Sequence, residues 1–337
     1  MENDAILQPV QTYRQHNFLE MQQRVEEEAF KSYEMVENGF LYRFPFTFTV
    51  PDQLTIHACR HQHQQWSSHN THLDVPPTMG FYHNGTKGTR LQNLCPENLS
   101  IAYAVEVTLK DEKGTLQSKE PWNFASRQIS ILPLSNINFP SNIRDKTSLF
   151  QPTPYPPPLY RKHAHLETLH IEPLTENPIT ICLPINPSNS NMKEVQTTFP
   201  LRVGFIPRHR GSLPQLNKIS RRLMTYTTLN AMQRSTHGQD KPHLDNHHVY
   251  TSSLPLPVLN MAARIKQSTT GSQSSRSEVI LQVPVSLPLD VKLMPSFDSC
   301  LISRSYTLEL CLSWGLVGSK DSYSSTLEIP LEIKVTR

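Results

Sequence analysis

The stretch from Ile302 to Trp314, ISRSYTLELCLSW, alternates between apolar and polar residues over most of its length. Successive side chains of a β-strand point to opposite faces, so a period of two gathers the apolar residues on one face. Arg304 is the one charge on that face, and we expect it to be structural, with its guanidinium paired or reaching the rim of the sheet. The stretch predicts a half-buried antiparallel strand. Its core residues are Ile302, Tyr306, Leu308, Leu310, Leu312 and Trp314.

Five further stretches of the chain repeat this alternation. They begin at Phe40, Ile101, Phe199, Val279 and Leu327. The turns between them are rich in Pro, Asn and Ser, and the chain has 28 prolines but only 11 glycines. Alternating strands joined by turns favour packed antiparallel sheets over a parallel sheet with crossover helices. The predicted fold class is mainly β, built from β-sandwiches.

Two segments differ from this pattern. Residues 16–33 are rich in Gln and Glu, and their apolar residues recur at steps of three or four, which predicts one short helix before the strand at Phe40. These apolar residues are Phe18, Met21, Val25 and Ala29. Residues 216–232 carry several β-branched side chains, so we predict strand and loop there.

The composition is typical of a globular cytoplasmic protein. A length of 337 residues is enough for two domains, and 37% of the residues are hydrophobic. No apolar run approaches the roughly 18 residues of a membrane span, and the N-terminus lacks the pattern of a signal peptide. The five cysteines are odd in number and scattered, which is typical of reduced packing residues. A net charge of +3 is too small to predict nucleic-acid binding.

The motifs of common enzymes and metal sites do not occur in the sequence. There is no G-x-S-x-G elbow, no H-E-x-x-H pair and no phosphate-binding glycine loop, so we expect neither catalysis nor a cofactor. One histidine-rich stretch could supply zinc ligands, but its spacings match no closed zinc site, so we expect no bound metal. Its candidate ligands are Cys59, His61, His63, His69 and His72.

Two parts of the sequence resemble the fungal arrestin-like proteins. YRFPFTFTVPDQL, from Tyr42 to Leu54, followed by HLDVPPTMG and LSIAYAVEVTL, is similar to the N-terminal lobe. MPSFDSCLISRSYTLELCLSWGL, followed by STLEIPLEIKV, is similar to the closing strands of the C-terminal lobe. The resemblance covers residues 12–134 and 279–337.

This resemblance implies two immunoglobulin-type β-sandwich lobes. Residues 1–134 would form the N-terminal lobe, 135–161 a proline-rich linker and 162–337 the C-terminal lobe. An arrestin N-terminal lobe has several strands before the helix, whereas here the predicted helix begins close to Met1. We therefore expect the first lobe to be incomplete.

The predicted linker contains the sequence PPPLY, from Pro156 to Tyr160. Consecutive prolines favour a polyproline II helix, which WW domains bind in an aromatic-lined groove. Pro157 and Pro158 would lie against the aromatic residues of that groove, and Tyr160 would fill a neighbouring pocket. In arrestin-like proteins this P-P-x-Y motif recruits HECT-type ubiquitin ligases. The alternative is a rigid spacer in which Tyr160 packs against a lobe.

Several basic residues gather between Arg208 and Arg222. They could meet anionic lipid headgroups or phosphorylated cargo at a membrane. A solvated face is the alternative. The candidates for such a contact are Arg208, Arg210, Arg221 and Arg222, with Lys218 between them.

The resemblance implies a non-enzymatic adaptor. Such an adaptor would bring a WW-domain ubiquitin ligase to membrane-protein cargo, such as transporters or receptors of the plasma membrane, and promote endocytosis. It would be cytoplasmic, with peripheral recruitment to the plasma membrane or endosomes. Two alternatives stay open: an arrestin-fold scaffold or degenerate paralogue without ligase contact, in signalling or trafficking, and a metal-dependent enzyme.

Overall fold

The computed structural model describes residues 15–31, 33–37, 39–55, 73–80, 94–96, 99–108, 124–134, 169–174, 178–185, 193–205, 214–230, 247–264, 277–291, 293–299, 302–316 and 322–336. The chain forms two compact units, Met1–Val75 and Pro76–Arg337. Within the described ranges, no helix has the length and hydropathy of a membrane-spanning segment.

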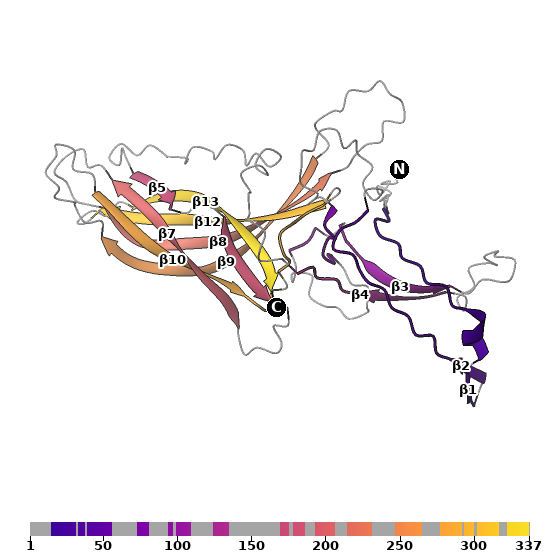
Figure 1. Cartoon of the computed structure of the whole chain (residues 1–337). Helices are drawn as coiled ribbons and strands as arrows, with labels where there is room; N and C mark the ends of the chain where they lie inside the picture. Colours follow the sequence, from indigo (N-terminus) through magenta and orange to yellow (C-terminus); the bar gives the residue numbers. More distant parts are fainter. Residues whose placement is uncertain are drawn as a thin grey trace, which may run out of the picture. The chain divides into compact units, whose positions relative to one another are not determined.

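The second unit contains a β-sandwich of two sheets (Figure 1). The larger sheet has the order β6-β13-β12-β8-β9, with β11 paired to β12; the smaller has the order β10-β7-β5. The strands of the larger sheet are β6 (Ile179–Pro184), β8 (Pro214–Asn230), β9 (His247–Arg264), β11 (Phe297–Asp298), β12 (Ile302–Leu316) and β13 (Ser322–Thr336). Those of the smaller sheet are β5 (Leu169–Pro173), β7 (Glu194–Phe205) and β10 (Ser277–Pro288).

Strand pairing in the sandwich is antiparallel except between β6 and β13, which run parallel. In the centre of the larger sheet, Leu308 of β12 lies opposite Leu223 of β8 and Ile329 of β13. In the smaller sheet, β7 lies between β10 and β5 along its C-terminal half. In β7, β10, β12 and β13 the sequence alternates over most of the strand, so that every second side chain can be buried on the core face.

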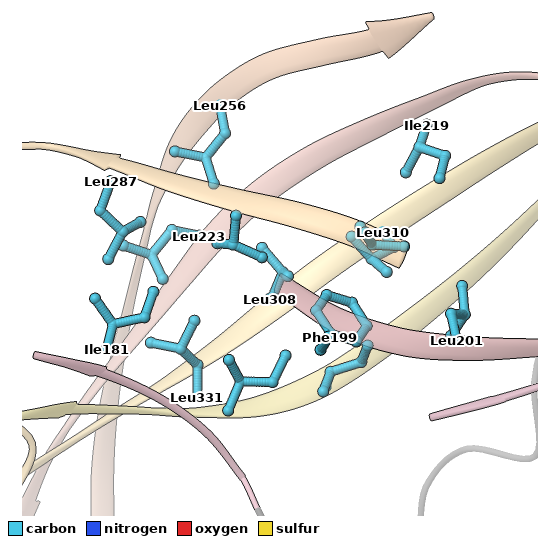
Figure 2. Packing of buried hydrophobic residues seen from close by; sticks show 14 of the residues in the cluster. Ile181, Phe199, Leu201, Ile219, Leu223, Leu256, Leu287, Leu308, Leu310 and Leu331 are labelled. Atoms are coloured by element: carbon cyan, nitrogen blue, oxygen red, sulfur yellow. The ribbon is translucent and has the colours of Figure 1, made fainter. Parts of the chain in front are cut away.

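The core of the sandwich lies between the inner faces of the two sheets. Leu308 and Leu310 of β12 belong to the same buried cluster as Phe199 and Leu201 of β7 (Figure 2). On β10 the buried residues alternate with more exposed neighbours, as the sequence predicts. Burial of apolar surface at about 25 cal/mol per Å² makes this cluster the main source of stability in the second unit.

Residues 76–134 belong to the same unit as the sandwich and carry a smaller two-stranded sheet. It pairs β3 (Tyr103–Thr108) with β4 (Phe124–Ile129). Met79 and Ile101 form an isolated bridge beside it, and the Thr78 amide donates to the Ile131 carbonyl at 2.8 Å. Gly80 next to this bridge has a φ of +88°, and a Cβ placed there would lie 2.6 Å from the Leu99 carbonyl oxygen. Only glycine fits this position without displacing the backbone.

The first unit contains a short 3₁₀-helix and a two-stranded antiparallel sheet. The helix is η1 (Glu27–Lys31), and the strands are β1 (Tyr33–Val36) and β2 (Gly39–Tyr42). The chain then continues to Leu54, whose amide donates to the Leu73 carbonyl at 2.7 Å. Gln53 and Asp74 form an isolated bridge at the same place.

The mainly β fold class is confirmed, with β8 adding a full strand where strand and loop were expected. Residues 15–26 form no regular structure, so the helix expected over residues 16–33 is limited to the single turn η1. Short helices depend on tertiary packing, and Val25 of the expected apolar stripe is exposed. The strand expected from Phe40 to Val50 is limited to β2. The expected linker, residues 135–161, lies outside the described residues, so the expected lobe boundaries remain a prediction.

Two neighbouring residues of β10 provide a test of the sandwich. Leu281 is 5% exposed and faces the core, whereas Ile280 is 54% exposed on the outer face. We expect Leu281→Ala to lower the free energy of unfolding by about 2 to 4 kcal/mol, because it leaves a cavity. Ile280→Ala should change it by less than about 0.5 kcal/mol. Urea denaturation of both variants measures the difference, and equal losses would contradict the assigned register.

Candidate functional site

The predicted site residues fall into two groups in the structure. Pro157, Pro158 and Tyr160 lie outside the described residues, as do Arg208 and Arg210. Arg221 and Arg222 lie next to each other on β8. Because neighbouring side chains of a strand point to opposite faces, these two arginines do not share a surface.

Arg221 points into the sandwich and is 5% exposed. Its Nε and Nη2 atoms donate to the Pro257 carbonyl of β9, at 2.9 and 2.6 Å. Its Nη1 atom donates to the Pro284 carbonyl of β10, in the opposite sheet. One buried guanidinium thus links β8 and β9 of the larger sheet to an edge strand of the smaller sheet.

The strand pairing explains why the Pro257 and Pro284 carbonyls accept hydrogen bonds from a side chain. The register between β8 and β9 shifts between Ile219 and Arg221, and Pro257 lies opposite this shift. A shift of this kind interrupts the ladder of backbone hydrogen bonds. Pro284 belongs to β10, which is an edge strand of the smaller sheet. A charged donor satisfies both carbonyls with hydrogen bonds stronger than those between neutral groups.

The surroundings of Arg221 act on its charge in two directions. Burial lowers the pKa of the guanidinium, and the Glu194 carboxylate partly opposes this shift. An arginine remains protonated over the pH range in which proteins fold. Its positive charge is therefore committed to the two carbonyls inside the sandwich.

Arg222 lies on the outer face of the larger sheet. Its side chain is 52% exposed, and Nη1 lies 3.2 Å from the Glu309 carboxylate of β12. Lys218 is exposed on the same face, four residues earlier on β8. Of the four arginines named as candidates for anion contact, Arg222 is the one that the described part of the chain presents to solvent, and Glu309 already neutralises it. The expected contact between these arginines and anionic groups remains a prediction.

Arg304 occupies a second buried polar cluster. It is 1% exposed, and its Nε atom donates to the Tyr306 hydroxyl at 2.8 Å. Its guanidinium lies 5.5 Å from the centre of the Tyr306 ring. Tyr306 in turn donates to the Met294 carbonyl at 2.9 Å. The structural role expected for Arg304 agrees with this burial.

The same arginine joins β12 to the segment that precedes the sandwich. Nη1 of Arg304 lies 3.1 Å from the sulfur of Cys95 and 3.8 Å from that of Met79. The Ser252 hydroxyl of β9 donates to the Leu94 carbonyl at 3.0 Å, next to Cys95. Sequence reasoning treated Cys95 only as a packing residue and did not single out Met79. Both residues lie more than 200 positions from Arg304, and no local pattern connects them to it.

Metal ligands do not gather in the described structure. The histidine-rich stretch from His57 to His72 lies outside the described residues. In the part of the chain that is described, no three His, Cys, Asp or Glu side chains come together as a metal site requires.

No protein-family model matches the sequence, and no curated protein matches it. Among solved structures, the chain is similar to Spo0M, a sporulation control protein from Bacillus subtilis, at 13% sequence identity and a TM-score of 0.21. The similarity covers 49% of this chain and 49% of that chain, so this chain spans about half of the structure it matches. A TM-score this low does not establish a shared fold. Membership of the arrestin-like family remains a prediction.

The two neighbouring arginines of β8 should differ sharply in their effect on stability. Arg221→Met removes a buried guanidinium and its hydrogen bonds to the Pro257 and Pro284 carbonyls, so we expect a loss of about 2 to 4 kcal/mol in the free energy of unfolding. Arg222→Met removes a half-exposed ion pair, so the loss should stay below about 1 kcal/mol. Urea denaturation compares them. Similar losses for both variants would show that Arg221 does not hold the two sheets together.

Two buried tyrosines should make the protein less stable at alkaline pH. Burial raises the pKa of Tyr103 and of Tyr306, and the Arg304 guanidinium partly opposes the shift at Tyr306. The folded state thus favours the neutral phenol, and an unfolded tyrosine ionises near pH 10. This contribution to stability is fully present below about pH 10 and is lost as the pH rises towards the folded pKa.

Absorbance of tyrosinate at alkaline pH measures this effect. At about pH 11, where the unfolded phenol of Tyr306 is ionised, Tyr306→Phe should lower the signal of the denatured chain but not that of the folded chain. Tyr103→Phe should behave in the same way. A lower signal in the folded variant would show that the phenol titrates normally in the native state.

Proposed function

We propose that this chain is a non-enzymatic adaptor that presents Pro157, Pro158 and Tyr160 to a WW domain of a HECT-type ubiquitin ligase. The observation that carries the proposal is the sequence PPPLY itself and its place in the chain. It stands between β4, which ends at Ile129, and β5, which begins at Leu169. Folded strands therefore flank the motif on both sides, so a ligase bound there is tethered directly to the folded protein.

The chemistry of the motif suits a WW groove. Each proline fixes φ near −65°, so the peptide loses little conformational entropy when it binds as a polyproline II helix. The prolines pack against aromatic side chains of the groove, and the tyrosine occupies a second pocket. A few anchors then supply most of the affinity.

The second part of the proposal is the cargo. The adaptor would hold membrane-protein cargo, such as a transporter or receptor, close to the bound ligase so that the cargo is ubiquitinated and internalised. Lys218, exposed on the outer face of β8, would approach anionic groups at a membrane surface, and Arg222 would add only the charge that its ion pair with Glu309 leaves. Arg208 and Arg210, shortly before β8 in the sequence, would add to this charge.

A tyrosine near the motif provides a matched control for the WW contact. Tyr160→Ala should weaken binding of the whole chain to its WW domain about thirtyfold, which corresponds to about 2 kcal/mol, because one anchor pocket is emptied. Tyr155→Ala, five residues earlier in the same proline-rich sequence, should change binding less than about threefold. Titration of a panel of WW domains against the three proteins measures the difference.

Thermal unfolding of the same three proteins separates the ligand from a spacer. The adaptor requires equal melting temperatures, since an exposed tyrosine contributes little to a core. If Tyr160→Ala lowers the melting temperature and no WW domain binds the wild-type chain, Tyr160 is a packing residue of a spacer. The ligase mechanism is then wrong, and a scaffold without ligase contact replaces it.

A further inference from the structure

The hairpin of the first unit carries a continuous face of aromatic side chains, which we call the aromatic face. Phe30 of η1 lies 4.9 Å from Phe44 and 6.0 Å from Tyr42, measured between ring centres. Tyr33 of β1 lies 6.0 Å from Tyr42 and 4.8 Å from Phe40. Met35 is paired with Phe40 across the hairpin. The aromatic face consists of Phe30, Tyr33, Met35, Phe40, Tyr42 and Phe44.

The register of the hairpin separates this face from a mixed one. Tyr33 pairs with Tyr42 and Met35 with Phe40, so these four side chains share one side and none of them is charged. The other side carries Glu34, Val36, Leu41 and Arg43, and Arg43 Nη2 lies 3.1 Å from the Glu34 carboxylate. Aromatic residues and Met without charge at the centre are the composition of a protein interface rather than of a solvated surface.

The aromatic face is exposed. Between 40 and 77% of the surface of Phe30, Tyr33, Met35, Phe40 and Tyr42 is accessible to solvent. Large side chains of this kind present roughly 200 Å² each, so the five together expose about 500 Å² of apolar surface. This equals the largest apolar patch of a typical monomer, and such patches mark interaction sites.

We propose that the aromatic face binds the aromatic face of a second copy of this chain. A twofold axis brings the same patch of both copies together, and an uncharged apolar face is complementary to itself. Two such faces bury about 1,000 Å², which is the lower limit for a specific interface. The product is a small sandwich of two two-stranded sheets.

Such a dimer also explains how the hairpin is held. A two-stranded hairpin is marginally stable in water unless another layer covers its apolar side. Every residue of β1 and β2 is exposed in the single chain. A second hairpin stacked at the usual sheet spacing of about 10 Å provides the missing layer without pairing any strand edge. This inference does not depend on the WW ligand.

Adjacent residues of β1 provide the test. Met35 belongs to the aromatic face and Val36 to the opposite face, and both are exposed, at 77 and 46%. Sedimentation velocity of the whole chain, up to about 200 μM, should show a dimer with a micromolar dissociation constant. Met35→Glu should raise that constant at least tenfold, because it places a carboxylate in the apolar contact. Val36→Glu should change it less than about twofold.

Circular dichroism of each variant establishes that the sandwich is intact, and Phe40→Ala replaces Met35→Glu if that chain does not fold. A wild-type chain that remains monomeric over this range would overturn the proposal. Equal weakening by Met35→Glu and Val36→Glu would also overturn it. Pairing through strand edges uses the backbone, so substitutions on either face of the hairpin would then have the same effect. Weakening by Val36→Glu alone would assign the contact to the opposite face and would overturn it as well.

Discussion

The two sheets of the sandwich are connected through one buried side chain, Arg221, which donates hydrogen bonds to strands of both. Apolar contact between two sheets that pack face to face has no preferred direction of its own. Arg221 adds directed hydrogen bonds from β8 to the Pro257 carbonyl of β9 and to the Pro284 carbonyl of β10. These bonds connect β10 to the larger sheet at one point inside the apolar cluster that packs the two sheets together.

Burying a guanidinium is costly, and the structure shows how two such groups are accommodated. Arg221 is surrounded by backbone carbonyls, whereas Arg304 meets a phenol hydroxyl, the face of the same ring and the sulfur of Cys95. In both cases the guanidinium donates to several acceptors inside the protein, which offsets part of the loss of hydration. Each arginine also joins segments that are distant in sequence, so both act as connectors inside the second unit.

Much of the sandwich could be predicted from alternation, because β7, β10, β12 and β13 bury every second residue. Alternation could not predict the partners of Arg221, since a carbonyl acceptor exists at every residue and only the register shift in β9 selects Pro257. Apolar residues at steps of three or four predicted a longer N-terminal helix than the five-residue η1, because such periodicity states which side chains share a side and not whether anything covers them. In the sequence the basic residues near β8 suggest one shared basic surface, but Arg221 and Arg222 point to opposite faces of the sheet.

The hairpin of the first unit shows the same limit of alternation, which does not reveal whether a face is covered. The apolar alternation of β12 and that of β2 look alike in the sequence, but the side chains of β12 are buried while Phe40 and Tyr42 remain exposed. A pattern of period two encodes a face, and burial of that face needs a second layer from elsewhere. In the sandwich the layer comes from the same unit. A hairpin face in contact with water can carry charged residues, but the aromatic face has none. Its composition therefore suits a surface that is covered by a layer from outside this hairpin.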